Sequence, residues 1–351
     1  MNTSLDSQLR FRPWLAFTMG DPAGVGPEVL VRAWKQPELH QICRGVVIGN
    51  LEVLQRAARL FAPEVQVVET TEKLPVEPDP QTMPCLDVVS PDACQVQPGT
   101  VDSRGGEAAY EATCEATRLA LAGVVAGLVT APLHKAALHA AGHPYPGHTE
   151  LLAELCGVNE VAMMLYLPPG AHVRGPHGLG VVHVTLHTAL RNVVHEVTIP
   201  AVLAKIRLVH HAMCRLMAHQ QTPRIAVAAL NPHAGESGLF GDEEQRIIEP
   251  AVRQAALEGI CAAGPFPADT LMVRAVAGDF DAVVAMYHDQ GHIALKLLSM
   301  HSAVNITLGL PIVRTSVAHG TAFDIAWQGR AQTSGLVHAA QVAARLAQTQ
   351  G

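Results

Sequence analysis

The sequence predicts an α/β fold with a mainly parallel sheet, organised as two lobes. Short runs of aliphatic and β-branched residues alternate with alanine-rich stretches of helical periodicity, a pattern typical of strand–helix–strand units. The chain has 351 residues, more than one hydrophobic core usually organises. Hydrophobic residues make up 49% of the chain and charged residues 16%, so the composition supplies a large core and excludes a disordered chain.

In the first part of the chain, the apolar residues 14–17 are expected to form the first strand. A second strand is expected at 46–49, and a helix near 52–60 follows it. A helix near 106–121 then precedes a strand at 127–130. Parallel neighbours need a crossover connection, so this order favours a parallel sheet with helices on both faces.

Two stretches carry turn residues rather than strand or helix patterns. Residues 74–98 are rich in proline and acidic residues, and we expect an irregular surface excursion there rather than a flexible linker. Residues 167–178 contain Pro-Pro-Gly and Pro-His-Gly, which indicates a hairpin or loop between two strands. The alternation itself continues with strands expected at 181–185, 225–230 and 282–286 and a helical pattern at 243–259.

Composition also excludes several classes of function. The chain has 31 acidic and 24 basic residues, a net charge of −7 and no run of Lys and Arg, so nucleic acid is not an expected partner. We find neither a signal segment nor an apolar run of about 20 residues, so we expect a cytoplasmic protein with no membrane association. The seven cysteines are scattered without a Cys-x-x-Cys pair, so we expect most of them to be reduced.

A glycine-rich turn follows the first expected strand. Residues 18–28 read Thr-Met-Gly-Asp-Pro-Ala-Gly-Val-Gly-Pro-Glu, with Pro27 near the start of a helix. Backbone N–H groups at such a turn can bind an anion or a nucleotide. The turn does not match the Gly-x-Gly-x-x-Gly pattern of dinucleotide-binding folds, so a simple strand-to-helix turn is an equal interpretation.

A second candidate anion site lies at Gly147-His148-Thr149, just before an expected helix at 150–155. An imidazole and a hydroxyl at a helix N-terminus suit a substrate carboxylate or phosphate, because the helix dipole favours negative charge there. The alternative is that Thr149 caps the helix and binds no ligand.

Three histidines, His187, His233 and His288, follow expected strands and precede turn residues. Neutral imidazole is a common ligand of zinc, cobalt and nickel, and three imidazoles with open positions describe a catalytic metal site. Parallel sheets place ligands at the carboxyl ends of their strands, which strengthens this interpretation. Spacing alone does not separate these three from His183, His195 and His292.

Two cations and a run of small residues complete the candidates. Lys296 and Arg314 flank mainly apolar segments, so we expect each to need an anionic partner, either a structural carboxylate or a ligand phosphate. Arg is especially suited to bidentate phosphate recognition. Residues 319–326 read His-Gly-Thr-Ala-Phe-Asp-Ile-Ala, where a nucleotide base can approach the backbone. Alternatively, this run caps a helix that begins near Thr321.

At these motifs the chain resembles the 4-hydroxythreonine-4-phosphate dehydrogenase family, which acts in pyridoxal phosphate synthesis. The resemblance implies the two-lobed fold of isocitrate and isopropylmalate dehydrogenases, with the active site in the cleft between lobes. The run at 319–326 is similar to the adenosine-binding loop of those enzymes. The expected first lobe is 1–145 plus 295–351, and the expected second lobe, with the metal ligands and the dimer contacts, is 146–294. The other motifs that carry the resemblance are residues 20–28, 146–150, 231–236, 287–291 and 305–311.

The resemblance also implies roles for individual residues. It places a divalent ion (zinc, cobalt, magnesium or nickel) on His187, His233 and His288, in a site completed across a homodimer interface. Two residues are candidates to accept the hydroxyl proton: Lys296, which could do so only if its pKa were lowered, and His148. The implied substrate contacts are His148, Thr149, Lys296, Asn305 and Arg314. The implied contacts of NAD or NADP are His319, Gly320, Thr321, Ala322 and Asp324.

The activity implied by the resemblance is oxidation of the 3-hydroxyl of 4-phosphohydroxy-L-threonine, followed by decarboxylation of the β-keto acid to 3-amino-2-oxopropyl phosphate. Related dehydrogenases oxidise 4-phospho-D-threonate or erythronate, and others oxidise a terephthalate 1,2-cis-dihydrodiol, which carries no phosphate. His148, Thr149, Asn305 and Arg314 favour a phosphorylated substrate. A hypothesis of another class is a binding protein that kept the fold and lost turnover.

Overall fold

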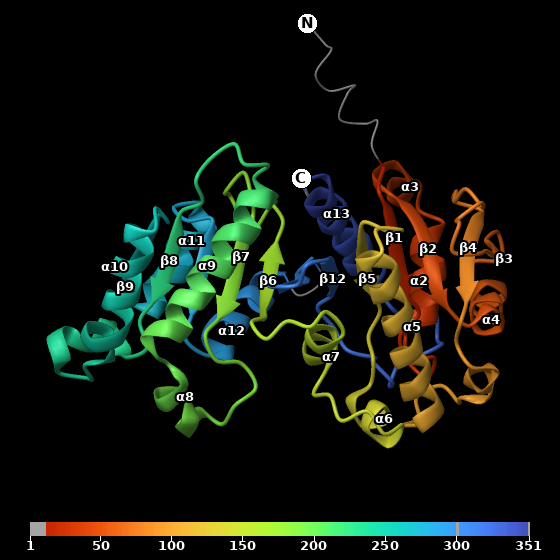
Figure 1. Ribbon diagram of the computed structural model, residues 1–351, viewed down its shortest axis with the longest axis horizontal. Helices are drawn as coiled ribbons and strands as arrows, with labels where there is room; N and C mark the ends of the chain where they lie inside the picture. Colours follow the sequence, from red (N-terminus) through yellow and green to blue (C-terminus); the bar gives the residue numbers. More distant parts are fainter. Residues whose placement is uncertain (1–11, 300–301, 350–351) are drawn as a thin grey trace, which may run out of the picture. The chain divides into compact units, whose positions relative to one another are not determined.

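The computed structural model describes residues 12–299 and 302–349. Its chain forms two compact units (Figure 1). Unit 1 comprises Met1–Val161 and Leu310–Gly351, and unit 2 comprises Ala162–Gly309. The expected lobe boundaries lie about 15 residues away at both crossings, because helix α7 (His148–Leu155) contacts α5 (Ser103–Leu121) of unit 1, and strand β11 (Val304–Leu308) pairs with β6 (Ala162–Leu167) of unit 2.

Unit 1 contains a parallel sheet with the order β3-β4-β2-β1-β5-β12. The central strands are buried along almost their whole length, since only the first residues of β1 and β2 are partly exposed, as expected where helices cover both faces. The strands are β1 (Trp14–Thr18), β2 (Arg44–Gly49), β3 (Gln66–Glu69), β4 (Thr82–Asp87), β5 (Gly127–Thr130) and β12 (Val313–Val317).

Helices α5 and α13 pack directly on the strands of unit 1. Polar side chains cap several of its helices: the Asn50 side chain accepts from Val53 N at the start of α4, and the Asp102 side chain accepts from Arg104 N at the start of α5. The remaining helical elements are α2 (Gly26–Trp34), α3 (Pro37–Ile42), α4 (Leu51–Phe61), η1 (Pro91–Gln95), α6 (Lys135–Ala140) and α13 (Ser334–Gln348).

The prediction of an irregular excursion at residues 74–98 is wrong. Strand β4 lies inside this stretch, pairs in parallel with both β2 and β3, and buries Met83 and Cys85 completely. Proline and acidic residues on both sides hide its short apolar run in the sequence. Pro84 is accommodated inside the strand, although proline cannot donate to a sheet.

Unit 2 contains a mixed sheet with the order β11-β6-β7-β10-β8-β9. Strand β6 pairs antiparallel with β7 and β11, and the other pairs are parallel, so the predicted hairpin at 167–178 is confirmed. The remaining strands are β7 (Leu179–His183), β8 (Ile225–Ala228), β9 (Ala262–Phe266) and β10 (Ala282–Ala285).

Two helices cover opposite faces of β7 in unit 2. Gly180 faces Met213 of α9, whereas Val181 and His183 face Gly291 of α12, as the alternation of a strand requires. Figure 1 shows α9 crossing in front of these strands. The helical elements are α8 (Leu190–Glu196), α9 (Ile199–Leu216), η2 (Pro232–Gly238), the π-helical turn η3 (Glu244–Ile248), α10 (Glu249–Leu257), α11 (Ala268–Ala277) and α12 (His288–Ser299).

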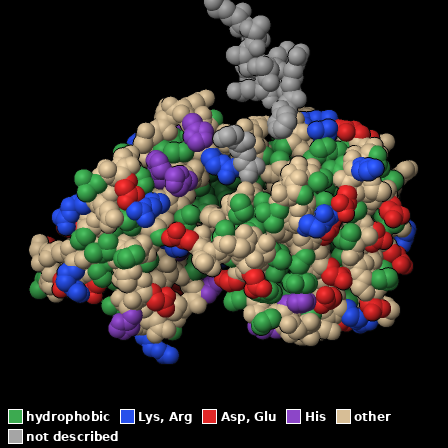
Figure 2. Space-filling view, in the orientation of Figure 1, with side chains coloured by type: hydrophobic (Ala, Val, Ile, Leu, Met, Phe, Trp, Pro, Cys, Tyr) green, Lys and Arg blue, Asp and Glu red, His purple; other side chains and the backbone are tan. Residues whose placement is uncertain are grey.

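The surface carries charges of both signs, and Figure 2 shows acidic and basic side chains interspersed over the face that it draws. Among the described helices, none alone has the length and apolar composition to cross a membrane. Helices α8 and α9 have the required length and composition only when they are taken together, and the chain bends by 90° between them.

Candidate active site

Unit 2 gathers four histidines at the carboxyl end of β7 and the start of α12. His183 is the last residue of β7, and His288 and His292 lie one turn apart at the start of α12. The ring centroid of His288 lies 6.0 Å from that of His187, 6.3 Å from that of His183 and 3.9 Å from that of His292. The prediction that His187 and His288 face the same site thus has a geometric basis in one unit.

His288 has the hydrogen bonding of a metal-binding imidazole. Its Nδ1 lies 2.7 Å from Oδ1 of Asp289, so Nδ1 donates to the carboxylate and Nε2 keeps its lone pair. Two imidazoles that bind one tetrahedral zinc ion at about 2.1 Å place their ring centroids roughly 5–6 Å apart. The 6.0 Å between His187 and His288 lies within that span. These two residues therefore fit a divalent ion.

His233 lies apart from this pair. Its side chain is 67% exposed, its ring contacts Phe240, and its Nδ1 lies 3.7 Å from Oε2 of Glu236. In the part of the chain that the structure describes, no group of three or more His, Cys, Asp or Glu side chains is arranged to hold a metal ion. One chain thus brings two of the three predicted ligands together and leaves the third on its surface.

The backbone that carries His233 is strained. The five residues from His233 to Ser237 all have positive φ, between 44° and 76°. Four of them carry side chains, and a left-handed residue of that kind costs roughly 1–2 kcal/mol. The turn also lines a pocket of about 350 Å³, with Asn231, Tyr287 and Gln290 among the other lining residues.

The buried carboxylate of Glu244 holds this turn from behind. It accepts hydrogen bonds from Leu230 N at 2.8 Å, Asn231 N at 2.7 Å and Asn231 Nδ2 at 3.0 Å. Glu244 is only 2% exposed, so its carboxylate depends on these hydrogen bonds rather than on water. Strain of this kind persists where the surroundings over-determine the backbone, and it is concentrated at functional sites.

Unit 1 contains a buried cation at the predicted phosphate site. Arg314 is 2% exposed in β12, and its Nε and Nη2 donate to the hydroxyl of Thr130 at 3.2 and 2.7 Å. Burial lowers the pKa of Arg314 to about 9, while Glu150 acts in the opposite direction. The expectation that a cation here needs an anion therefore applies to Arg314. A bound phosphate dianion would compensate the desolvated charge.

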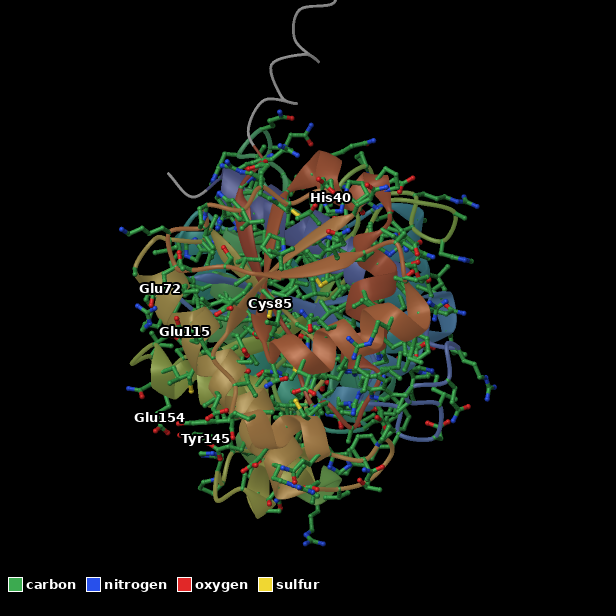
Figure 3. All side chains as sticks on the ribbon, turned by 90° about the vertical axis from the view of Figure 1, so that its right-hand side faces the viewer. His40, Glu72, Cys85, Glu115, Tyr145 and Glu154 are labelled. Carbon is green, nitrogen blue, oxygen red and sulfur yellow. The ribbon has the colours of Figure 1, made fainter. Side chains whose placement is uncertain are left out.

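His148 begins α7 close to this cation. Burial, and then the positive charge of Arg314, lower the pKa of His148 well below its ordinary value, and its buried Nε2 has no hydrogen-bond partner among the described residues. The N-cap residue of α7 is Gly147, and no side chain makes a capping hydrogen bond at this helix start. The alternative in which Thr149 caps the helix is therefore wrong. Figure 3 shows Tyr145 and Glu154 side by side, and the Tyr145 hydroxyl donates to Glu154 Oε1 at 2.9 Å, which ties the segment before α7 to its last turn.

The other two predicted substrate contacts lie in unit 2. Asn305 is in β11, and its buried Oδ1 has no hydrogen-bond partner within the described ranges. Lys296 is exposed on α12, two turns after His288 on the same side of the helix. The argument that burial forces an anionic partner on Lys296 is therefore wrong, because water solvates its charge.

The run at 319–326 packs onto the glycine-rich turn of unit 1. Val25 N donates to Thr321 O at 3.0 Å, and a Cβ on Gly24 would lie 2.9 Å from Thr321, so glycine is required for this contact. Ring stacking at 4.5 Å joins His134 to Phe323. Residues 323–329 form turns and no helix begins near Thr321 within the described residues 302–349, so that alternative is wrong. Two motifs separated by about 300 residues in sequence thus form one surface, in which Gly320 faces open space.

Asp21 lies in this turn, and the sequence alone assigns it no role. It is fully buried, its Oδ1 accepts from Ala23 N at 2.9 Å, and its buried Oδ2 has no partner in the described part of the chain. Burial raises the pKa of Asp21 to about 6 despite that hydrogen bond. Glu244 likewise has no signal in the sequence, because its role depends on loop geometry, and the role of Thr130 depends on its strand neighbour Arg314. A spacing of four residues on one helix was the available signal for His288 and His292.

Comparison with known proteins agrees with the resemblance found in the motifs. A family model described as "Pyridoxal phosphate biosynthetic protein PdxA" matches residues 41–343. The chain is 47% identical over 341 residues to a protein of Geobacter metallireducens named 4-hydroxythreonine-4-phosphate dehydrogenase, with 97% of each chain covered. It is 43% identical over 335 residues to a D-threonate 4-phosphate dehydrogenase of Pectobacterium atrosepticum, with 95% of this chain and 99% of that protein covered.

Solved structures give the same result. The crystal structure of a 4-hydroxythreonine-4-phosphate dehydrogenase from Klebsiella pneumoniae matches with a TM-score of 0.84 and 42% identity, covering 95% of this chain and 99% of that one. A β-decarboxylating dehydrogenase from Thermococcus kodakarensis matches with a TM-score of 0.50 and 12% identity, covering 93% of this chain and 81% of that one. The second match shows a shared fold only, and it confirms the predicted class.

Proposed function

The chain belongs to the pyridoxal phosphate biosynthetic protein PdxA family and is a dehydrogenase acting on CH–OH groups, and from this membership we propose that it oxidises a phosphorylated hydroxy acid with NAD or NADP and a divalent metal ion. The first candidate substrate is 4-phosphohydroxy-L-threonine, whose oxidation at the 3-hydroxyl gives a β-keto acid that loses carbon dioxide to form 3-amino-2-oxopropyl phosphate.

The observation that carries the proposal is the burial of Arg314 close to His148. A desolvated guanidinium beside the N-terminus of a helix suits a phosphate, and the terephthalate dihydrodiol considered above carries none. His148, Thr149 and Arg314 are the proposed phosphate contacts in unit 1. In unit 2, Lys296 and Asn305 are the substrate contacts that the resemblance implies. The second candidate, 4-phospho-D-threonate, is supported by the 43% identity to the D-threonate 4-phosphate dehydrogenase.

The metal ion and the nicotinamide cofactor have separate proposed sites, one in each unit. A bound divalent ion lowers the pKa of a coordinated hydroxyl and stabilises negative charge on its oxygen. His187 and His288 would hold it, and a second copy of the chain would contribute the exposed His233. The run His319, Gly320, Thr321, Ala322 and Asp324, packed on the glycine-rich turn, would bind the adenosine end of NAD or NADP.

Two side chains are suited to accept the substrate's hydroxyl proton. His148 is neutral, because its pKa is lowered, and its Nε2 is available. Lys296 lies on the same side of α12 as His288. Either residue would act as a general base only within hydrogen-bond reach of the hydroxyl.

The proposed dimer and location have separate support. Leu190, Val194, Leu239 and Phe240 of unit 2 expose large apolar side chains, and Leu239 and Phe240 directly follow the turn that carries His233. Such surface suits a second copy of the chain. The seven cysteines are free, which suits a reducing compartment such as the cytoplasm.

The decisive experiment follows the absorbance of the reduced nicotinamide with the purified protein. NAD and NADP are each offered with 4-phosphohydroxythreonine, 4-phosphothreonate, 4-phosphoerythronate and the terephthalate dihydrodiol, with zinc, cobalt, magnesium or nickel and with a chelator. We expect metal-dependent turnover of a phosphorylated substrate. Turnover of the dihydrodiol alone would contradict the phosphate site, and no turnover with any substrate and metal would leave a binding protein.

A further inference from the structure

His292 contacts the proposed metal ligand His288 in two ways. The two rings are stacked, with 3.9 Å between centroids and 6° between planes. The Nδ1 of His292 also lies 3.3 Å from the backbone oxygen of His288. His292 is only 5% exposed, so the ring of His288 rests on a buried neighbour rather than on solvent.

His292 is in turn anchored to β7. Its Nδ1 lies 3.1 Å from Nε2 of His183, which is 3% exposed. A carbonyl oxygen only accepts, so the contact with His288 O identifies Nδ1 of His292 as the N–H donor. Nε2 of His183 is then the acceptor. This bond fixes the rotation of the His292 ring relative to the sheet.

The stacking excludes His292 as a ligand of the same ion. The lone pair of an imidazole nitrogen lies in the ring plane, so a metal ion lies close to the plane of each ring that binds it. The planes of His288 and His292 are nearly parallel and separated, so they do not meet within coordination distance of the two rings. His292 therefore supports the face of His288 instead of sharing its metal.

Gly291 makes this arrangement possible. A Cβ at this position would lie 2.4 Å from Nε2 of His183 and 2.8 Å from a methyl group of Val181. The backbone of α12 therefore approaches β7 as closely as atoms allow, which brings His292 to hydrogen-bond distance of His183. Strand, glycine and histidine pair form one support beneath His288.

We infer that His292 is a positioning residue for the metal site: anchored by His183, it fixes the ring plane of His288 so that Nε2 is aimed before the ion binds. This inference rests on the proposed function, because it concerns the metal ligand assigned there. Partners behind a metal ligand typically change metal affinity by about 10–100-fold when they are removed. Removing His292 should therefore weaken metal binding, beyond any effect on the stability of the fold.

The test measures zinc dissociation constants by competition with a chromophoric chelator, together with the visible spectrum of the cobalt-loaded protein. His292→Phe keeps a stacking ring and loses the hydrogen bond, and we expect about tenfold weaker binding. His292→Leu loses both, and we expect up to about 100-fold weaker binding with an altered cobalt spectrum. Leu297→Ala, an exposed position on the same helix, is the matched control.

Variants of His183 keep the test independent of His292. His183→Gln retains an acceptor oxygen, and we expect binding within about threefold of wild type. His183→Leu removes the acceptor, and we expect the tenfold loss of His292→Phe. Because both substitutions break one bond, the double variant should bind no more weakly than either single variant. Thermal unfolding of each variant without metal reports the stability separately.

The outcomes separate the inference from the proposed function. If the wild-type protein binds no divalent ion, the proposed metal centre is wrong. If wild type binds and His288→Ala does not, but all His292 and His183 variants bind like wild type, the metal centre stands and the positioning role is overturned. If His292→Leu abolishes binding as completely as His288→Ala does, His292 is a ligand, and the positioning role is again overturned.

Discussion

Arg314 and Thr130 are joined across two neighbouring parallel strands, with Nε and Nη2 of Arg314 donating to the one hydroxyl of Thr130 at 3.2 and 2.7 Å. Thr130 ends β5, and in the register of the pair it lies opposite Ser316, two residues beyond Arg314. The guanidinium therefore extends along the strands toward their carboxyl ends. Loops and helix N-termini converge there in parallel sheets, which places the cation where a ligand binds.

Replacing Arg314 by Lys should impair phosphate recognition. Lysine keeps a charge but loses the planar fork, so we expect the KM for the phosphorylated substrate to rise about 10–100-fold, the range of one or two charged hydrogen bonds. The KM for NAD should change little. Steady-state kinetics with each substrate varied, and inhibition by inorganic phosphate, check this. Arg59→Lys, an exposed position on α4, should match wild type, and an unchanged KM in Arg314→Lys would contradict the phosphate role.

Metal content should depend on His187 and His288 and not on every histidine. We expect His187→Ala and His288→Ala to purify with less than about a tenth of the wild-type zinc, because each removes one nitrogen ligand. Elemental analysis after dialysis measures this. His195→Ala is the control, since His195 is exposed on α8. Equal loss in all three variants would show that the effect is not specific to a ligand set.

A site shared between two copies makes a quantitative prediction. His233→Ala and His187→Ala homodimers should each be inactive, but mixing them through subunit exchange should restore about a quarter of wild-type activity. Half of the dimers are then hybrids, and each hybrid contains one intact site. Activity after mixing, with dimer formation measured by sedimentation, tests this. Failure to recover activity in confirmed hybrids would place all three ligands within one chain.

The strained turn before α10 should depend on Glu244. Its carboxylate accepts three hydrogen bonds in a buried position, and in Glu244→Gln an NH₂ group faces N–H donors. We expect the free energy of unfolding to fall by about 2–4 kcal/mol, since hydrogen bonds to buried charged groups are worth about 1.5–3 kcal/mol each. Denaturant unfolding measures this. Glu249→Gln, whose side chain is 42% exposed, should change stability by less than about 0.5 kcal/mol.

Asp21 predicts a pH dependence of stability. Burial raises its pKa to about 6 in the folded protein from 3.8, so the folded state binds more protons than the unfolded state between these values. The free energy of unfolding should therefore fall as the pH rises from about 4 to about 6. Asp21→Asn does not titrate and keeps an acceptor for Ala23 N. We expect it to match wild type at pH 4 and to exceed it by about 2–3 kcal/mol at pH 8.

Thermal and denaturant unfolding at pH 4, 6 and 8 check this prediction. The exposed Asp269→Asn should follow the wild-type curve at all three values. Parallel curves for wild type and Asp21→Asn would mean that Asp21 is ionised equally easily in both states.

Local pattern was sufficient for most of the fold and insufficient for its exceptions. The strands near residues 14, 46, 127 and 282 are recognisable because uninterrupted apolar runs are bounded by turn residues. Strand β4 was missed because Pro84 and its proline-rich flanks imitate a loop, while its stability comes from β2 and β3, which are distant in sequence. Non-local pairing of that kind leaves no periodic signal.

Some features of the candidate site can likewise be predicted from the sequence, and others cannot. The position of His187, His233 and His288 after strands was visible in the sequence, but the left-handed backbone at His233 was not, since four of its five residues are not glycine. The burial of Arg314 and the exposure of Lys296 also could not be distinguished, because both sequences are apolar around the cation. The backbone conformation at His233 and the burial of each cation depend on the folded structure and not on the local sequence.

The close approach at Gly291 has a consequence for engineering. A glycine inside a helix is the usual first choice for replacement in thermostability design, because alanine is favoured there by about 1 kcal/mol. At this position the new methyl group would occupy the space of the His183 ring and displace the first turn of α12. The alanine therefore does not gain that advantage of about 1 kcal/mol at this position, and Gly291 should be held constant in a library designed for heat resistance.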